Sequence, residues 1–168
     1  SEAVIDKKYG ITIYEPLNMM LGTDTVRNDN DGYAANGYEE DFYTTGQLMH
    51  KGFYVDGQLK IYKNYYPNGN VERNFRLVDL KKSKMTTYYE DGTMRSNIVY
   101  IGNEAQKWED YYPNGTLEFI EEYNKSFEYY VFKANYYENG TPENTMELTN
   151  KKKLLYTQIY YHENGNIK

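Results

Sequence analysis

Apolar and polar residues alternate on both sides of a recurring glycine, and this alternation is the main pattern of the 168-residue chain. Around Gly115 the alternating stretch runs from residue 108 to residue 121. Successive side chains of a β-strand point to opposite faces, so the pattern predicts two half-buried strands. Asn114-Gly115 between them predicts a hairpin, because both central residues of a type I′ turn need a positive φ that Asn and Gly tolerate. A two-residue turn would pair Tyr112 with Leu117, Asp110 with Phe119 and Trp108 with Glu121.

The hairpin signal recurs along the chain with a nearly constant period. Its turn glycines are spaced by 23, 23, 23, 25 and 25 residues, at Gly46, Gly69, Gly92, Gly115, Gly140 and Gly165. Four copies share the run Tyr-Tyr-x-Asn/Asp-Gly, the first copy has Phe42-Tyr43 in place of Tyr-Tyr, and the last is interpreted with one inserted residue. A fixed period of this length indicates a repeat array. We therefore predict an all-β fold, an elongated single-layer antiparallel meander of about six hairpin repeats with roughly a dozen strands.

Three columns of residues follow from the predicted register. The residues three before and two after each glycine are predicted to share the buried face: Tyr43, Tyr66, Tyr89, Tyr112 and Tyr137 with Leu48, Val71, Met94, Leu117, Pro142 and Ile167. The residues four before each glycine form an aromatic column on the opposite face, which starts at Phe42 and continues as Tyr65, Tyr88, Tyr111 and Tyr136. We call these four tyrosines the tyrosine rail. Two interpretations stay open, a ladder of cross-strand contacts that stiffens the sheet and a binding surface for an extended ligand or a protein.

The segments between the hairpins are less regular. Residues 55–58 predict another tight turn, and residues 79–84, 101–106, 124–128 and 149–153 predict polar loops. Pro142 predicts an edge, a bulge or a shortened strand, because proline cannot donate to the ladder. The final strand is expected to be clipped or to lie beyond Lys168.

The first 37 residues do not fit the repeat. We divide the chain into an acidic amino-terminal segment, 1–37, and a repeat array, 38–168. In the first part, residues 11–14 predict a strand, the apolar residues 17–21 predict a cap over the open end of the sheet, and residues 28–32 predict a loop.

The run Tyr-Tyr-x-Asn/Asp-Gly-x-Leu/Met/Val resembles the bacterial variant of the MORN repeat (membrane occupation and recognition nexus), over about residues 38–168. The resemblance implies β-hairpin repeats in an elongated, twisted single-layer sheet. It also implies a scaffold or interaction module, no catalytic motif residue, frequent export in bacteria and, for some members, an antitoxin label. Only Gly57 and Gly102 fall in return turns, where the variant usually carries a second glycine pair. A weaker resemblance is to choline- or wall-binding hairpin repeats, which are rich in Trp, whereas this chain has Trp108 alone.

Composition narrows the possible partners. Tyrosine supplies 22 of 168 residues and suits a half-buried surface. Residues 1–40 hold three basic and eight acidic residues, 3 − 8 = −5 of the net charge of −6, and residues 41–168 supply the remaining −1. This charge argues against nucleic-acid binding and against docking on anionic lipid. The absence of cysteine excludes disulfides, zinc knuckles and a thiol nucleophile, and no apolar run reaches the length of a transmembrane helix.

The candidate chemistry is sparse. His50 and His162 lack the Ser or Asp partners at fixed spacing that a catalytic histidine needs, so both are interpreted as structural. Residues 27–32 have the glycine of a calcium loop, but Arg27 and Tyr38 occupy ligand positions where carboxylates are required. We expect no enzyme activity, no cofactor and no metal.

These observations predict a non-enzymatic scaffold that mediates protein–protein interaction, in the bacterial cell envelope. Alternatives are a carbohydrate- or wall-binding module that uses exposed tyrosines, and an antitoxin-like protein. The expected location is the periplasm or the outer-membrane surface, with a lipid-modified cysteine just before Ser1. A cytoplasmic location is the alternative.

Overall fold

The computed structural model describes residues 4–6, 11–13 and 26–168, which contain thirteen strands and no helix. The first two strands, β1 (Val4–Asp6) and β2 (Ile11–Ile13), pair antiparallel. β2 confirms the strand predicted at 11–14. The apolar cluster predicted to act as a cap, residues 17–21, lies outside the described residues. The predicted loop at 28–32 is confirmed as a short hairpin closed by a bridge between Asn28 and Ala34.

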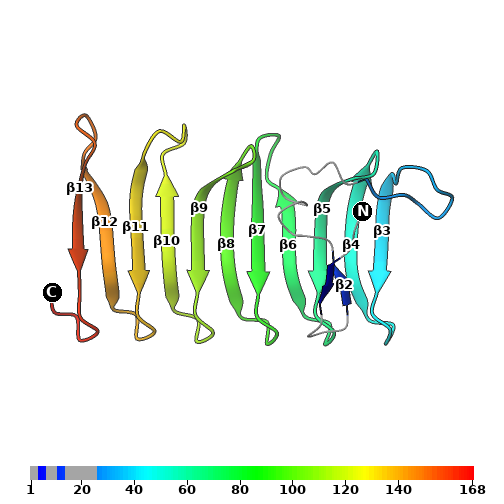
Figure 1. The fold of residues 1–168 in the computed structure, drawn as a ribbon, viewed down its shortest axis with the longest axis horizontal. Coiled ribbons are helices and arrows are strands. Elements are labelled where there is room, and N and C mark those ends of the chain that lie inside the picture. The colour runs from blue at the N-terminus through cyan, green and yellow to red at the C-terminus, as the bar shows by residue number, and fades with distance from the viewer. Residues whose placement is uncertain (1–3, 7–10, 14–25) are drawn as a thin grey trace. The chain divides into compact units, whose positions relative to one another are not determined.

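The chain divides into two compact units, residues 1–77 with 90–92, and residues 78–89 with 93–168. The repeat strands of the first unit are β3 (Gly37–Phe42), β4 (Leu48–Val55), β5 (Gln58–Tyr65) and β6 (Val71–Leu77). Each of them pairs antiparallel with the next one along the chain (Figure 1).

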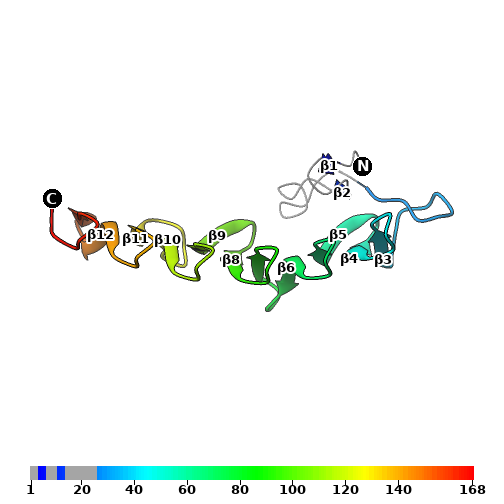
Figure 2. The same ribbon diagram turned by 90° about the horizontal axis from the view of Figure 1, so that it is seen from below.

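The second unit continues the same pattern with seven strands, which lie side by side in chain order (Figure 1). They are β7 (Lys82–Tyr88), β8 (Met94–Ile101), β9 (Glu104–Tyr111), β10 (Leu117–Tyr123), β11 (Tyr130–Tyr136), β12 (Pro142–Asn150) and β13 (Leu155–Tyr160). Seen edge-on, these strands form one layer (Figure 2). The predicted fold class, an all-β antiparallel meander of hairpin repeats, is confirmed, with eleven repeat strands.

All six turn glycines lie at a hairpin turn and adopt φ between +89° and +92°, as predicted. The type of turn differs from the prediction. The amide of Gly115 donates to the carbonyl of Tyr112 (2.9 Å), and the amide of Tyr112 donates to the carbonyl of Thr116 (2.8 Å). This is a three-residue loop with a type I turn and a glycine bulge, in which only the glycine needs a positive φ. In this copy Pro113 favours the observed turn, because proline suits the first central position of a type I turn, whereas in the predicted turn it would stand opposite Thr116 with no amide to donate.

The extra loop residue shifts the register by one position next to the turn, and a bulge between Leu117 and Phe119 restores it further along the strands. Asp110 pairs with Phe119 and Trp108 with Glu121, as predicted, but Leu117 pairs with Tyr111 and not with Tyr112. Directly opposed residues point to the same side of a sheet. The residues two after each glycine therefore share a face with Phe42 and the rail tyrosines, and not with the tyrosines three before each glycine. This corrects the predicted buried face. The observed pairs are Phe42–Leu48, Tyr65–Val71, Tyr88–Met94, Tyr111–Leu117 and Tyr136–Pro142.

The tyrosines three before the glycines have a different role, which the sequence analysis missed. The hydroxyls of four of them donate a hydrogen bond to a backbone carbonyl of the next repeat: Tyr43 to Tyr65, Tyr89 to Tyr111 (2.7 Å), Tyr112 to Tyr136 (2.6 Å) and Tyr137 to Tyr161 (2.9 Å). We call these four donors the tyrosine ladder. The turn asparagines repeat the device, because the side-chain amides of Asn68, Asn114 and Asn139 donate to the carbonyls of Glu90, Glu138 and Glu163. The ladder explains why the second tyrosine of the signature recurs.

The last copy needs no inserted residue. The carbonyl of Tyr161 receives the ladder bond from Tyr137, and Tyr161 pairs with Ile167. Tyr161 therefore stands four before Gly165, and His162 replaces the ladder tyrosine.

Two of the return connections are two-residue turns. Asp56 (φ +49°) and Gly57 (φ +78°) form the predicted tight turn between β4 and β5, and here both central residues have the positive φ of type I′. The loop predicted at 101–106 is shorter, because Ile101 pairs directly with Glu104. Pro142 is the first residue of β12 and stands beside a bulge, as predicted, but the nine-residue strand is not shortened.

Candidate functional site

In each unit the rail residues lie on one face of the sheet, which we call the tyrosine face of that unit. Within each unit, every rail tyrosine is half-buried against the aliphatic or proline side chain directly opposite on the next strand. Phe42, which starts the column, is 55% exposed. Aromatic and aliphatic cross-strand pairs stabilise a sheet, so the rail contributes to the fold and leaves ring surface accessible as well.

The central rail hydroxyl is firmly held. The hydroxyl of Tyr111 donates to Oε2 of Glu109, two residues earlier on the same face (2.9 Å). Burial, together with this hydrogen bond and the charge of Glu109, raises the pKa of Tyr111 to about 12. Burial also raises the pKa of Tyr136. Both phenols are therefore neutral at physiological pH.

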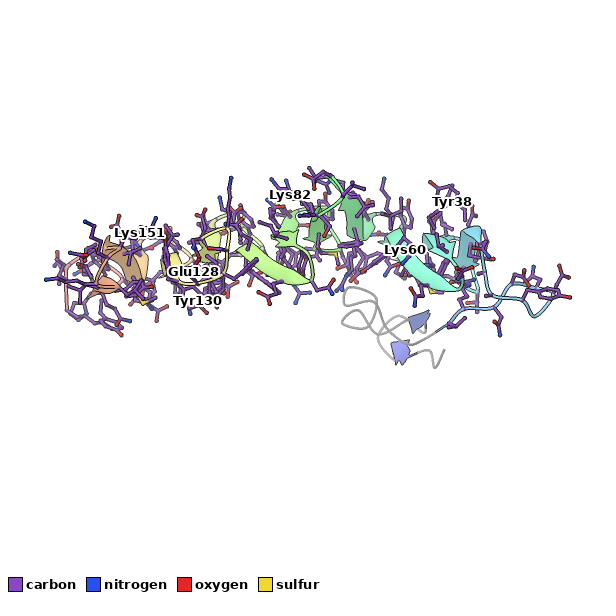
Figure 3. All side chains as sticks on the ribbon, turned by 90° about the horizontal axis from the view of Figure 1, so that it is seen from above. Tyr38, Lys60, Lys82, Glu128, Tyr130 and Lys151 are labelled. Carbon is purple, nitrogen blue, oxygen red and sulfur yellow. The ribbon has the colours of Figure 1, made fainter. Side chains whose placement is uncertain are left out.

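The tyrosine face of the first unit is built from rows that run across the strands. One row places Glu40, Lys51, Lys63 and Asn74 side by side on β3 to β6. A second row places Tyr38 beside Phe53 and Phe53 beside Ile61. Tyr38 is 63% exposed and projects from β3 (Figure 3).

A shallow hollow of about 450 Å³ lies on this surface. Its lining includes the aromatic rings of Tyr38 and Tyr65, the cationic Lys51, Lys63 and Arg76, and Ile61. The sequence predicts Tyr65 as a site residue but none of the other eight lining residues. The signal that could have found them is the register itself, because residues on four strands come together only once the pairing is known.

His50 lies on the opposite face, in a buried polar cluster. It is 3% exposed, its Nδ1 lies 2.6 Å from Oδ1 of Asn64, and its Nε2 lies 2.9 Å from the hydroxyl of Tyr54. Beside it, the guanidinium of Arg27 donates two hydrogen bonds to Asp41 (2.7 and 2.8 Å). These surroundings agree with the interpretation of His50 as structural. His162 is exposed and contributes its backbone to the last turn.

The burial of His50 predicts a dependence of stability on pH. Burial lowers the pKa of His50 below its ordinary value of 6.5, so the unfolded state takes up a proton before the folded state does. The contribution of neutral His50 to stability is therefore complete above pH 6.5 and is lost as the pH falls through the folded-state pKa. Thermal unfolding at a series of pH values should show a smaller loss of stability on acidification for His50→Gln than for wild type. Parallel curves would contradict this.

Within residues 26–168, no group of three or more His, Asp or Glu side chains is placed to hold a metal ion. In the loop that resembles a calcium site, Oδ1 of Asp29 accepts hydrogen bonds from the amides of Asp31 and Tyr33. In the part of the chain that the structure describes, no helix is long and apolar enough to cross a membrane.

A family model described as "MORN repeat variant" matches residues 35–56, 57–74 and 107–125. These three segments are MORN repeats of the variant type. The first two cover β3, β4, β5 and the first part of β6, and the third covers most of β9 and all of β10, so the matches fall on hairpins of the structure. MORN repeats take part in protein and membrane interactions, and the chain carries this type of module.

No curated protein shows significant sequence similarity to the chain. Two solved structures of TarM resemble it. A Staphylococcus aureus TarM mutant in complex with Fondaparinux, alpha-GlcNAc-glycerol and UDP has 13% identity and a TM-score of 0.39, over 74% of this chain and 21% of that one. A second structure of TarM has 14% identity and a TM-score of 0.37, over 73% of this chain and 21% of that one. The chain thus spans about a fifth of their length, and at these TM-scores the likeness supports no conclusion.

Proposed function

We propose that the chain is a non-catalytic repeat scaffold that binds proteins through its tyrosine face. The observation that supports this most is the 63% exposure of Tyr38, which lines the hollow together with Tyr65, and the 55% exposure of Phe42 on the same strand. Tyr and other aromatic residues are enriched in the cores of protein interfaces. The second unit has its own row of half-buried rail tyrosines, Tyr88, Tyr111 and Tyr136.

The repeat architecture suits a scaffold. Each hairpin contacts only its neighbours, and the tyrosine ladder ties each repeat to the next through backbone carbonyls. This construction supports the sheet without using the rail hydroxyls. The rail side chains can therefore contact a partner while the ladder side chains hold the repeats together.

The rail is tested by replacing Tyr88 and Tyr111 together with serine. Hot spots are aromatic and central, so the double variant should lose partners that wild-type protein captures from native membranes, as measured by quantitative mass spectrometry. Its matched control replaces Tyr156 and Tyr160, which face the other side of the sheet in the same unit. Full capture by the rail variant, with only a lower melting temperature, would show that the rail is structural. Capture of cell-wall polysaccharide in place of protein would favour the carbohydrate alternative.

We further propose a location in the bacterial cell envelope, with a lipid-modified cysteine before Ser1. The acidic start of the chain and the absence of cysteine from residues 1–168 support this location. Mass spectrometry of the amino terminus of the native protein tests it directly. An unmodified terminus recovered in the cytosolic fraction would contradict it.

A further inference from the structure

The charged row of the first unit contains an arrangement that weakens an isolated sheet. Lys51 on β4 lies directly opposite Lys63 on β5, and like charges at opposed positions repel each other. Glu40 lies 3.8 Å from Lys51 and compensates part of the charge. Among residues 26–168, no carboxylate lies within ion-pair distance of Lys63. The net charge of the chain is −6, so this pair of cations is a local exception.

Apolar and aromatic rows border the lysines on both sides. Tyr38, Phe53 and Ile61 form one border, and the opposed pair Tyr65–Val71 belongs to the other. The Tyr38 ring also lies under the ammonium of Lys51, with Nζ 5.2 Å from its centroid. The hollow thus offers positive charge at its centre and apolar surface at its margins.

We propose that this hollow binds an acidic segment of a partner protein, whose carboxylates lie on Lys51 and Lys63 and whose apolar side chains rest against Tyr38, Ile61 and Tyr65. This rests on the proposed function and specifies the partner chemistry. A small anion would leave the apolar borders unused. A flat bilayer of anionic lipid would cover more of the chain than the hollow alone and is repelled by its net negative charge. A flexible peptide can place carboxylates on the lysines and apolar side chains on the borders at the same time.

The test uses short synthetic peptides and the full chain. A fluorescent peptide combines glutamate and leucine in a Gly-Ser background, and its counterpart has glutamine in place of every glutamate. By fluorescence anisotropy, wild-type protein should bind the glutamate peptide at least about tenfold more tightly than the glutamine peptide. The preference should weaken at high salt, because exposed charges are screened.

Paired charge reversals distinguish the hollow from the charge of the whole chain. The double variant Lys51→Glu with Lys63→Glu should lose about tenfold or more in affinity for the glutamate peptide. The control Lys152→Glu with Lys153→Glu makes the same change in net charge on the loop between β12 and β13 and should retain wild-type affinity. The single variant Lys63→Glu places opposite charges on Lys51 and position 63. It should bind weakly while its melting temperature stays at or above that of wild type, so that loss of binding is separated from loss of folding.

Equal affinity for the two peptides, or full binding by the double variant, would overturn the proposal. Tighter binding to anionic vesicles or to an oligonucleotide than to the glutamate peptide would also overturn it, because the occupant would then be of another class. If peptide binding fails while the rail still captures native partners, the proposed function stands and only this inference falls.

Discussion

Replacing Gly57 with alanine is expected to destabilise the first unit by about 3 kcal/mol or more. Gly57 has φ +78°, a conformation that costs an L-residue about 1–2 kcal/mol. An added Cβ would also lie 2.2 Å from Cγ1 of Val26 and 2.8 Å from the carbonyl oxygen of Arg27. The segment at 26–27 must therefore move. The hydrogen bond from the Arg27 amide to the Gly57 carbonyl (2.9 Å) is then weakened, which adds about 1 kcal/mol.

Gly102 provides a matched control for this prediction. It stands in the corresponding two-residue turn of the second unit with φ +62°, and an added Cβ there meets nothing within 4 Å. Gly102→Ala should therefore show the backbone cost alone, about 1–2 kcal/mol. Denaturant unfolding followed by circular dichroism measures both variants. Equal costs at the two glycines would contradict the close approach between Gly57 and residues 26–27.

Removing three ladder hydroxyls, with Tyr89, Tyr112 and Tyr137 each changed to phenylalanine, is expected to cost the second unit about 3 kcal/mol. Each change leaves the ring in place and deletes one hydrogen bond to the carbonyl of the next repeat. A hydrogen bond of this kind contributes about 1 kcal/mol, and separate sites add. Partial burial raises the pKa of Tyr89 and of Tyr112.

The control for the ladder replaces Tyr160, an exposed tyrosine of the same unit, with phenylalanine. Substitutions at exposed positions change stability little, so this variant should unfold with wild type. The fluorescence of Trp108, the single tryptophan of the chain, reports the second unit directly, because its indole Nε1 donates to Asp110 within that sheet. Identical unfolding curves for the ladder variant and wild type would show that water replaces the deleted bonds without cost.

The opposite roles of the two signature tyrosines explain why the repeat is so recognisable. The first tyrosine packs beside an aliphatic or proline residue on the tyrosine face, and its carbonyl accepts the ladder bond. The second tyrosine donates the ladder bond to the next copy. Loss of the first tyrosine removes a packing contact on the tyrosine face, and loss of the second removes a hydrogen bond to the next repeat. The ladder variants and the rail variants therefore separate stability from binding in one chain.

The sequence by itself determined the repeat period, the position of every glycine turn and the all-β class. These features are local, because residues that are adjacent in the sequence predict both the positive φ at the glycine and the alternation of strand side chains between the two faces. Within one repeat, Gly115, Asn114 and the two tyrosines before them were sufficient to predict the turn and the strand that leads into it. The predicted pairing of Asp110 with Phe119 also holds, but only because the bulge between Leu117 and Phe119 restores the register that the longer turn had shifted.

Only the tertiary structure decided which residues share a face beyond the first pairs, and hence where the hollow lies. A bulge beside each turn moved Leu117 from Tyr112 to Tyr111, and one further residue in a strand changes the side to which its successors point. A second bulge, at Phe53 and Tyr54, shifts the pairing between β4 and β5. The opposition of Lys51 and Lys63 depends on the Asp56-Gly57 turn together with this bulge. The local sequence pattern places each of these residues on a strand, but it does not show that they are neighbours. Side-chain proximity across strands is set by hydrogen-bond pairing and not by sequence spacing.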